Sequence, residues 1–261
     1  MHMLPKPLFI HIFLIATALL IGGCSSTTKQ EELEAETAGM AEYQIYQEAE
    51  NSMELKRYAN AIDMFQQLES RFPFGEYAQQ AQLELIFAYI KNLEPEAAIA
   101  TADRFIRLNP QDPKVDYAYY LKGIALYEID LGFVERYISS ENADKDPGRA
   151  REAFSVFYQL LKRFPDSEYA PDARARMVYL RNRLAAYEIA VGKYYMTRGA
   201  YVAAANRGRY VVDNYRTTPS VEDGLKMMLE SYRALDLNEM ADDTEALIKK
   251  NFPDADIETD S

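Results

Sequence analysis

The chain of 261 residues has no tryptophan, a single cysteine and only two histidines. Both histidines, His2 and His11, lie near the N-terminus, and the cysteine is Cys24. Without histidine after residue 11 and without a second cysteine, the chain cannot build a Ser-His-Asp or Cys-His catalytic site or the common zinc sites. It also lacks a glycine-rich phosphate-binding loop. These absences predict a protein that is not an enzyme and holds no cofactor or metal.

Two acidic patterns bear on this prediction. Asn142, Asp144 and Asp146 have the spacing of a calcium loop, but Pro147 and Ala153 stand where that loop needs glycine and a bidentate glutamate. The 41 Asp and Glu residues must also place some carboxylates in pairs, as a glycoside hydrolase requires. Solvated helix faces account for them better, so an enzyme acting on envelope polymer is the least favoured alternative.

The N-terminus reads as a secretory signal. A short start with Lys6 is followed by an apolar stretch over residues 8–21, too short for a membrane-spanning helix, and then by small residues. The sequence Ile-Gly-Gly-Cys ending at Cys24 resembles the bacterial lipobox, in which the cysteine is acylated and becomes the first residue of the mature protein. Residues 1–23 are therefore predicted to be removed and Cys24 to carry lipid. Ser25 in place of aspartate favours the outer membrane. The alternative is a cleaved signal with an incidental cysteine.

The segment after the cysteine is polar and acidic. Residues 24–39 are predicted to form a flexible tether of about 20 Å between the lipid and the folded part. Removing the signal leaves 28 Lys and Arg residues against 41 Asp and Glu residues, a formal charge of −13. This charge disfavours nucleic acid and anionic lipid as partners. Membrane attachment through the lipid alone is expected.

A motif recurs five times along the rest of the chain. Each copy carries alanine twelve residues before a closing position. Further residues, mostly apolar, stand eleven, eight, five and one residues before the same closing position. This spacing places them on one stripe of a helix. The alanines are Ala61, Ala98, Ala153, Ala204 and Ala241, and the closing residues are Pro73, Pro110, Pro165, Arg216 and Pro253. Proline cannot continue a helix, so each copy is predicted to end a helix at its closing position.

The spacing of the copies predicts the fold. Copies 37 residues apart are close to the tetratricopeptide length of about 34. The first helix of each pair is expected at residues 41–56, 77–92, 115–131, 171–198 and 219–235. The longer central intervals are assigned to an insertion near residues 132–146 and a lengthened helix through 179–198. The prediction is an all-α superhelical solenoid of about five tetratricopeptide-like helix pairs. Residues 40–146 form its N-terminal half, 147–253 its C-terminal half and 254–261 an acidic tail.

The 20 tyrosines leave an alternative open. Tyr117, Tyr120, Ile124 and Tyr127 share one helical face, which favours packing of one helix pair on the next. Rings with a polar tip also suit a peptide-binding groove, and the sequence does not separate the two.

Several segments together resemble the BamD family, the tetratricopeptide lipoprotein subunits of the outer-membrane β-barrel assembly machinery. They are residues 71–77 (RFPFGEY), 105–110 (FIRLNP), 144–147 (DKDP), and Tyr194-Tyr195 before Arg198-Gly199. The match covers nearly the whole mature chain and includes the lipobox. Arg216 in place of proline and the acidic tail are small departures.

The resemblance implies a scaffold without catalytic activity. Its C-terminal half would dock on the periplasmic POTRA region of BamA, and its N-terminal half would face unfolded outer-membrane proteins and the lipoprotein BamC, with BamE as a further partner. Arg198 is the candidate charged contact with BamA, supported by Tyr194, Tyr195 and Tyr201, although a cation at a helix end also satisfies terminal carbonyls. Position and chemistry suggest Tyr77, Gln80, Tyr89 and Tyr117 for the N-terminal groove. The alternative function is an envelope lipoprotein that binds and regulates peptidoglycan enzymes.

Overall fold

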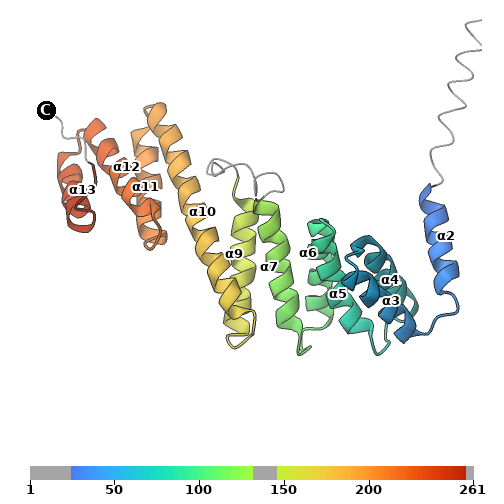
Figure 1. Ribbon diagram of the computed structural model, residues 1–261. Coiled ribbons are helices and arrows are strands. Elements are labelled where there is room, and N and C mark those ends of the chain that lie inside the picture. The colour runs from blue at the N-terminus through green and yellow to red at the C-terminus, as the bar shows by residue number, and fades with distance from the viewer. Residues whose placement is uncertain (1–24, 132–145, 257–261) are drawn as a thin grey trace, which may run out of the picture. The chain divides into compact units, whose positions relative to one another are not determined.

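The computed structural model describes residues 25–131 and 146–256. These residues form eleven helices and no strand, which confirms the predicted all-α class (Figure 1). The helices are α2 (Ser25–Thr37), α3 (Glu42–Glu54), α4 (Tyr58–Arg71), α5 (Ala78–Lys91), α6 (Pro95–Leu108), α7 (Val115–Leu131), α9 (Gly148–Arg163), α10 (Ala170–Thr197), α11 (Tyr201–Asn214), α12 (Ser220–Ala234) and α13 (Asn238–Asn251).

The predicted first helices agree with α3, α5, α7, α10 and α12 to within two residues at each end. The lengthened helix is also confirmed, since α10 has 28 residues. The predicted insertion covers residues 132–146, and all of these but residue 146 lie outside the described residues. Cys24, the signal segment and most of the acidic tail also lie outside them.

The chain divides into two compact units, with the boundary inside α5 between Ala88 and Tyr89. In the first unit α3 packs on α4, and α2 contacts α4. In the second unit α6, α7, α9, α10 and α11 pack in sequence order, followed by α12 and α13. This boundary differs from the predicted division at residue 146, which separates the two halves that carry candidate binding surfaces. That division stays a prediction.

The repeated motif supplies the core of both units. All five alanines of the motif are at most 4% exposed. The residues five before each closing position, Leu68, Phe105, Leu160, Val211 and Ile248, are fully buried. A small side chain at the first position lets two helix backbones approach, and a larger one at the second fills the space between helices. The stripe read from the sequence is thus the face that each second helix buries.

Each second helix also ends in the same way. The residue before each closing position has φ between −125° and −136°, and its backbone N–H donates to the carbonyl of the buried residue four before it. The fourth copy shows this ending at Tyr215 although Arg216 follows in place of proline. The closing proline is therefore compatible with this helix end but is not what produces it.

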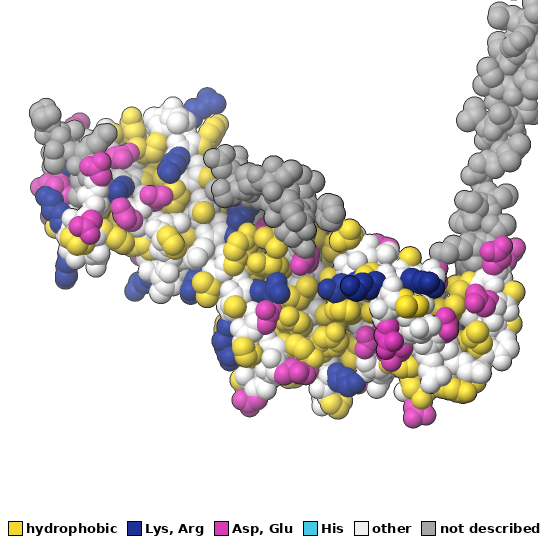
Figure 2. Space-filling model, viewed as in Figure 1, with side chains coloured by type: hydrophobic (Ala, Val, Ile, Leu, Met, Phe, Trp, Pro, Cys, Tyr) yellow, Lys and Arg dark blue, Asp and Glu magenta, His cyan; other side chains and the backbone are white. Residues whose placement is uncertain are grey.

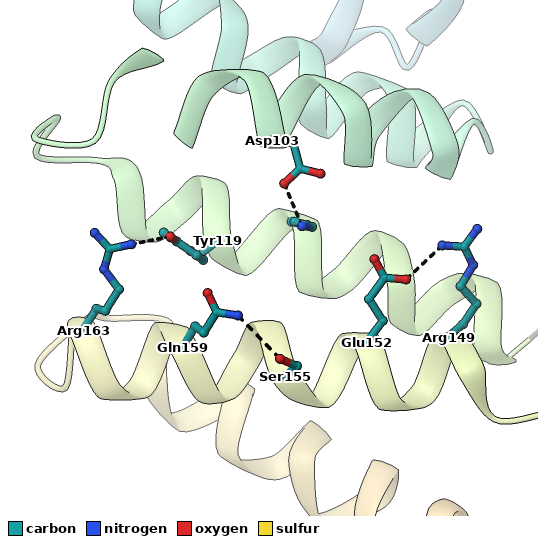
Figure 3. A network of polar contacts seen from close by, with 8 residues as sticks. Asp103, Tyr119, Arg149, Glu152, Ser155, Gln159 and Arg163 are labelled. Atoms are coloured by element: carbon teal, nitrogen blue, oxygen red, sulfur yellow. Dashed lines mark hydrogen bonds and ion pairs between the residues drawn. The ribbon is translucent and has the colours of Figure 1, made fainter. Parts of the chain in front are cut away.

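Polar contacts join neighbouring helices at the edge of this core (Figure 3). The ammonium of Lys122 on α7 donates to Asp103 on α6 at 2.7 Å. The guanidinium of Arg163 on α9 donates to the hydroxyl of Tyr119 on α7. These contacts fix how α6, α7 and α9 lie side by side.

One prediction about the N-terminus is wrong. Residues 25–37 form a helix, α2, and not the flexible coil expected from their polar composition. The last turn of α2 is held by a residue far along the chain, since the Arg71 guanidinium donates to the carbonyls of Thr37, Ala38 and Met40. A cation that satisfies terminal carbonyls stabilises a helix end. Glutamate, leucine and alanine are also favourable in helices.

Candidate partner-binding surfaces

The end of α10 presents a cation and an aromatic ring to solvent. Arg198 forms the C-cap of α10, and its guanidinium lies 5.3 Å from the centre of the Tyr194 ring. Arg198 is exposed, and Tyr194 is 56% exposed. The structure gives Arg198 no ion pair within the described part of the chain. A guanidinium held over a ring but lacking a carboxylate partner is suited to an acidic group on another molecule.

The turn after Arg198 depends on glycine. Gly199 has φ of +67°, and a Cβ built on it would meet nothing within 4 Å. The amides of Arg198 and Ala200 both donate to the Tyr195 carbonyl, which closes the turn. The left-handed backbone, and not a lack of space, is what favours glycine here.

The other two predicted residues of this surface are half-buried. Tyr201 starts α11, and Tyr195 packs against a core cluster of Ala185, Ile189, Ala204, Val211 and Met227. Tyr195 therefore supports the turn from below, while Tyr194 and Arg198 project from it. We call Tyr194 and Arg198 the α10 knuckle.

An ion pair between α10 and α11 was not predicted from the sequence. Arg207 on α11 donates to the Glu188 carboxylate on α10 at 2.7 Å, and the Glu188 side chain is only 8% exposed. The hydrogen bond that Arg207 donates to Glu188, with a smaller contribution from its hydrogen bond to Tyr195, raises the pKa of Arg207. A glutamate on the apolar face of a long helix was the available signal, because a buried carboxylate needs a partner.

Two of the predicted groove residues lie in the first unit. The backbone amide of Tyr77 donates to the Glu42 carboxylate at 2.7 Å, and the centre of the Tyr77 ring lies 4.8 Å from the centre of the Tyr46 ring. The side-chain amide of Gln80 donates to the Glu84 carboxylate at 2.6 Å. Tyr77 and Gln80 are half-buried. Part of each side chain is thus open to a ligand.

The other two groove residues lie in the second unit. Tyr89 is only 8% exposed, so its ring offers almost no surface to a client. Tyr117 is half-buried and stacks on Tyr169 with ring centres 5.0 Å apart. A groove shared by all four residues stays a prediction, because they are divided between the two units.

The tyrosine stripe of α7 meets the next helix pair, as one of the two open alternatives predicted. Tyr169 stacks on Tyr120 as well as on Tyr117, with ring centres 4.7 Å apart. Farther along, Tyr127 meets Tyr179 of α10 edge-on at 5.4 Å. We call these five tyrosines the aromatic row. Figure 2 shows hydrophobic side chains gathered over α7.

Charges are built into the aromatic row. Tyr120 donates its hydroxyl to Asp172 at 2.9 Å, and Asp172 pairs with Arg176 at 2.6 Å. The Arg176 guanidinium lies 4.8 Å from the centre of the Tyr127 ring. Burial raises the pKa of Tyr169 to about 12 and also raises the pKa of Tyr120 and Tyr127. The Tyr120 hydroxyl is thus held as the donor to Asp172.

Two general properties bear on function. Among residues 25–131 and 146–256, no group of three or more His, Cys, Asp or Glu side chains is arranged to bind a metal. No helix in the same ranges has the length and hydropathy needed to cross a membrane.

Comparison with known proteins identifies the family. A family model described as YfiO, outer membrane lipoprotein, matches residues 38–247. The outer membrane protein assembly factor BamD of Neisseria meningitidis serogroup B is 39% identical over 92% of this chain and 90% of its own length. The chain belongs to the BamD family. The BamD of Vibrio cholerae serotype O1 is 36% identical over 91% of this chain and 96% of its own length.

Solved structures with helical repeats are more distant. A tetratricopeptide protein of Thermus thermophilus superposes with a TM-score of 0.37 at 15% identity, covering 82% of this BamD-family chain and 93% of its own. The type IV pilus biogenesis factor PilW superposes with a TM-score of 0.36 at 16% identity, covering 93% of each chain. A likeness this loose carries no functional argument.

Proposed function

We propose that this chain is an assembly factor for outer-membrane proteins that acts as a scaffold and not as a catalyst. The observation that carries the proposal is the 39% identity, over 92% of the chain, to a protein named for that role. The sequence supports a non-catalytic role, since histidine is absent after residue 11. Stacked helix pairs present side chains from several helices to a partner, as a scaffold requires.

The α10 knuckle is the proposed contact with the POTRA region of BamA. Arg198 and Tyr194 are exposed and lie together at the end of α10. Arginine and tyrosine are among the residues that dominate interface energies. Removing one member of a desolvated charge pair typically costs about 2 to 5 kcal/mol, much of it from the charge left unpaired.

Unfolded outer-membrane proteins are the proposed clients. The aromatic row and the partly exposed Tyr77 and Gln80 offer rings and hydrogen-bonding groups to an extended chain. A helical surface can hold such a chain weakly without supplying the strand edge that promotes aggregation. BamC and possible BamE subunits are further proposed partners.

Lipid at Cys24 is the proposed anchor, which would place the protein on the periplasmic face of the outer membrane. The lipobox and the family match beginning at residue 38 support this arrangement. A lipid anchor with more than one acyl chain holds a protein at a membrane without any spanning helix.

The test is binding of a soluble chain that begins after Cys24 to the purified POTRA domains of BamA. Arg198→Glu is expected to weaken binding by about 2 kcal/mol or more. Arg216→Glu makes the same charge change at another exposed site of the second unit and should leave binding nearly unchanged. Equal effects of the two variants would reject the α10 knuckle as the contact. No binding by the unmodified chain would favour the peptidoglycan-enzyme alternative.

A further inference from the structure

The connection between α4 and α5 projects a phenylalanine into solvent. Phe74 is 99% exposed, more than any other large hydrophobic side chain in the described part of the chain. It is flanked by Pro73 and Gly75. An isolated apolar residue on a surface is ordinary, so exposure alone does not indicate a function.

The repeats supply an internal reference for this position. Phe74 directly follows the closing residue of the first copy. The residues at the same place in the other four copies are Gln111, Asp166, Thr217 and Asp254, which are all polar. The three connections between helices that carry Gln111, Asp166 and Thr217 thus do without an apolar side chain, so the geometry of the turn does not require Phe74.

The backbone around Phe74 is held in place from two sides. The Gly75 amide donates to the Phe72 carbonyl at 3.0 Å, and the amides of Glu76 and Tyr77 donate to the Glu42 carboxylate at 3.2 and 2.7 Å. A Cβ on Gly75 would lie 2.0 Å from a Glu42 carboxylate oxygen, so only glycine leaves room for this contact. A side chain mounted on an ordered backbone loses less entropy on binding than one on a flexible loop.

The charged residue nearest to Phe74 in sequence is acidic. Arg71, the nearest cation in sequence, directs its guanidinium at the carbonyls of Thr37, Ala38 and Met40. Glu76 is exposed two residues after Phe74. The surface that the loop offers is therefore an apolar tip beside a carboxylate, which is complementary to an apolar pocket with a basic rim.

The position of the loop argues against a membrane as the occupant. Arg71 contacts the C-terminal end of α2, whereas the proposed lipid at Cys24 precedes the other end. The 13 residues of α2 separate those ends by about 20 Å. The exposed side chains of α2 include Glu31, Glu32 and Glu36, so anionic lipid would not hold this helix flat on its surface.

We propose that Phe74 is the anchor of a docking surface for a folded protein domain that offers an apolar pocket rimmed by Lys or Arg. A folded domain is required because an unfolded client has no preformed pocket for a fixed side chain. This surface lies in the first unit and is independent of the proposed contact at the α10 knuckle in the second. Its failure would leave the proposed function untouched.

The first step of the test uses the full chain in cells of its own organism. The photoreactive amino acid p-benzoylphenylalanine replaces Phe74 in one variant and Asp166, its counterpart in the third copy, in the control. We expect irradiation to give one protein adduct from position 74 that position 166 does not give. Adducts with lipid only, with a second copy only or with unfolded outer-membrane proteins only would overturn the proposal, as would equal adducts at the two positions or none.

The second step measures affinity for the purified partner from that adduct. Phe74→Ser is expected to weaken binding at least tenfold, Phe74→Leu much less, and Asp166→Ser not at all. Glu76→Lys should weaken binding several-fold, with the loss reduced at high salt because rim charges are screened. Thermal unfolding should be the same for Phe74→Ser and the unmodified chain, since the ring is 99% exposed. Binding that is indifferent to Phe74→Ser would overturn the proposal even if the adduct formed.

Discussion

The third and fourth copies of the motif solve the same packing problem with opposite residues. Eight residues before the closing position the third copy has Phe157 and the fourth has Gly208. The Phe157 ring fills a notch above Gly123, where an added Cβ would lie 2.4 Å from a ring carbon. A Cβ on Gly208 would instead lie 2.4 Å from the Gly224 carbonyl oxygen of α12. A ring separates the helices in one copy, and the backbones themselves meet in the other.

This difference shows that the repeated motif fixes which face is buried but not how closely the helices approach. Alanine twelve residues before the closing position is common to both copies and is fully buried in both, at Ala153 and Ala204. The opposing position holds glycine in both cases, so the approach is set by the motif residue itself, which is a ring at Phe157 and has no side chain at Gly208. The contact with a ring can relax when the ring is removed, whereas the contact between backbones cannot.

The largest effect is expected at the ring. Phe157→Ala should lower the free energy of unfolding of the second unit by about 3 to 5 kcal/mol, because a fully buried ring leaves a cavity. Thermal and denaturant unfolding measure this loss. Gly123→Ala should be harmful alone but neutral or restoring in the Phe157→Ala background, since the clash is with the ring. Additive losses in the double variant would contradict the proposed ring-in-notch packing.

A smaller loss is expected at the close approach of α11 and α12. Gly208→Ala should cost about 1 to 3 kcal/mol, because the methyl group meets a carbonyl oxygen and forces the helices apart. Met228 also lies near the added Cβ, at 3.0 Å. Met228→Ala in the same chain should therefore fail to restore the stability measured by denaturant unfolding. Full restoration would show that a side chain and not the backbone limits the approach.

The turns between paired helices extend the comparison to backbone conformation. Gly199 closes the fourth pair at φ +67°, and Leu93 occupies a similar conformation at φ +64°. Gly199→Ala should lower the free energy of unfolding by about 1 kcal/mol. Alanine is strained in the left-handed conformation, and its smaller conformational entropy in the unfolded state offsets part of that strain. Leu93→Gly should stabilise by roughly 0.5 kcal/mol for the converse reason. Calorimetric unfolding of both variants tests whether their changes in stability have opposite signs. A loss of stability in Leu93→Gly would contradict this expectation.

The smallest effect is expected in the fifth copy, where the position eight residues before the closing residue holds Glu245. Its carboxylate accepts from Arg233 of α12 at 2.8 Å and from Lys249 at 2.5 Å, and the hydrogen bond with Lys249 is the main cause of its lowered pKa. A lowered pKa means stability that is present above the ordinary glutamate value of 4.5 and is lost as the pH falls. Glu245→Gln should therefore lower the melting temperature slightly at pH 7. The difference should vanish in acid, and a constant difference across pH would contradict this role.

Much of the fold was readable from the sequence. The register of the five copies predicted the helix boundaries, the buried stripe and the length of α10, because these depend on periodicity and on residues a few positions apart. The exposed position of Arg198 at a helix end was equally local, since Gly199 marks the turn. The family resemblance was readable for the same reason, since it rests on short segments in order.

Only the tertiary structure decided features that join distant residues. Arg71 holds the end of α2, and Glu42 receives the amides of Glu76 and Tyr77 just before α5, across 31 to 35 positions of sequence. The burial of Tyr89, the Glu188 and Arg207 pair between α10 and α11, and the exposure of Phe74 were likewise invisible in the pattern. A motif specifies which residues lie on one helical face, but the contacts of that face depend on which helix packs against it.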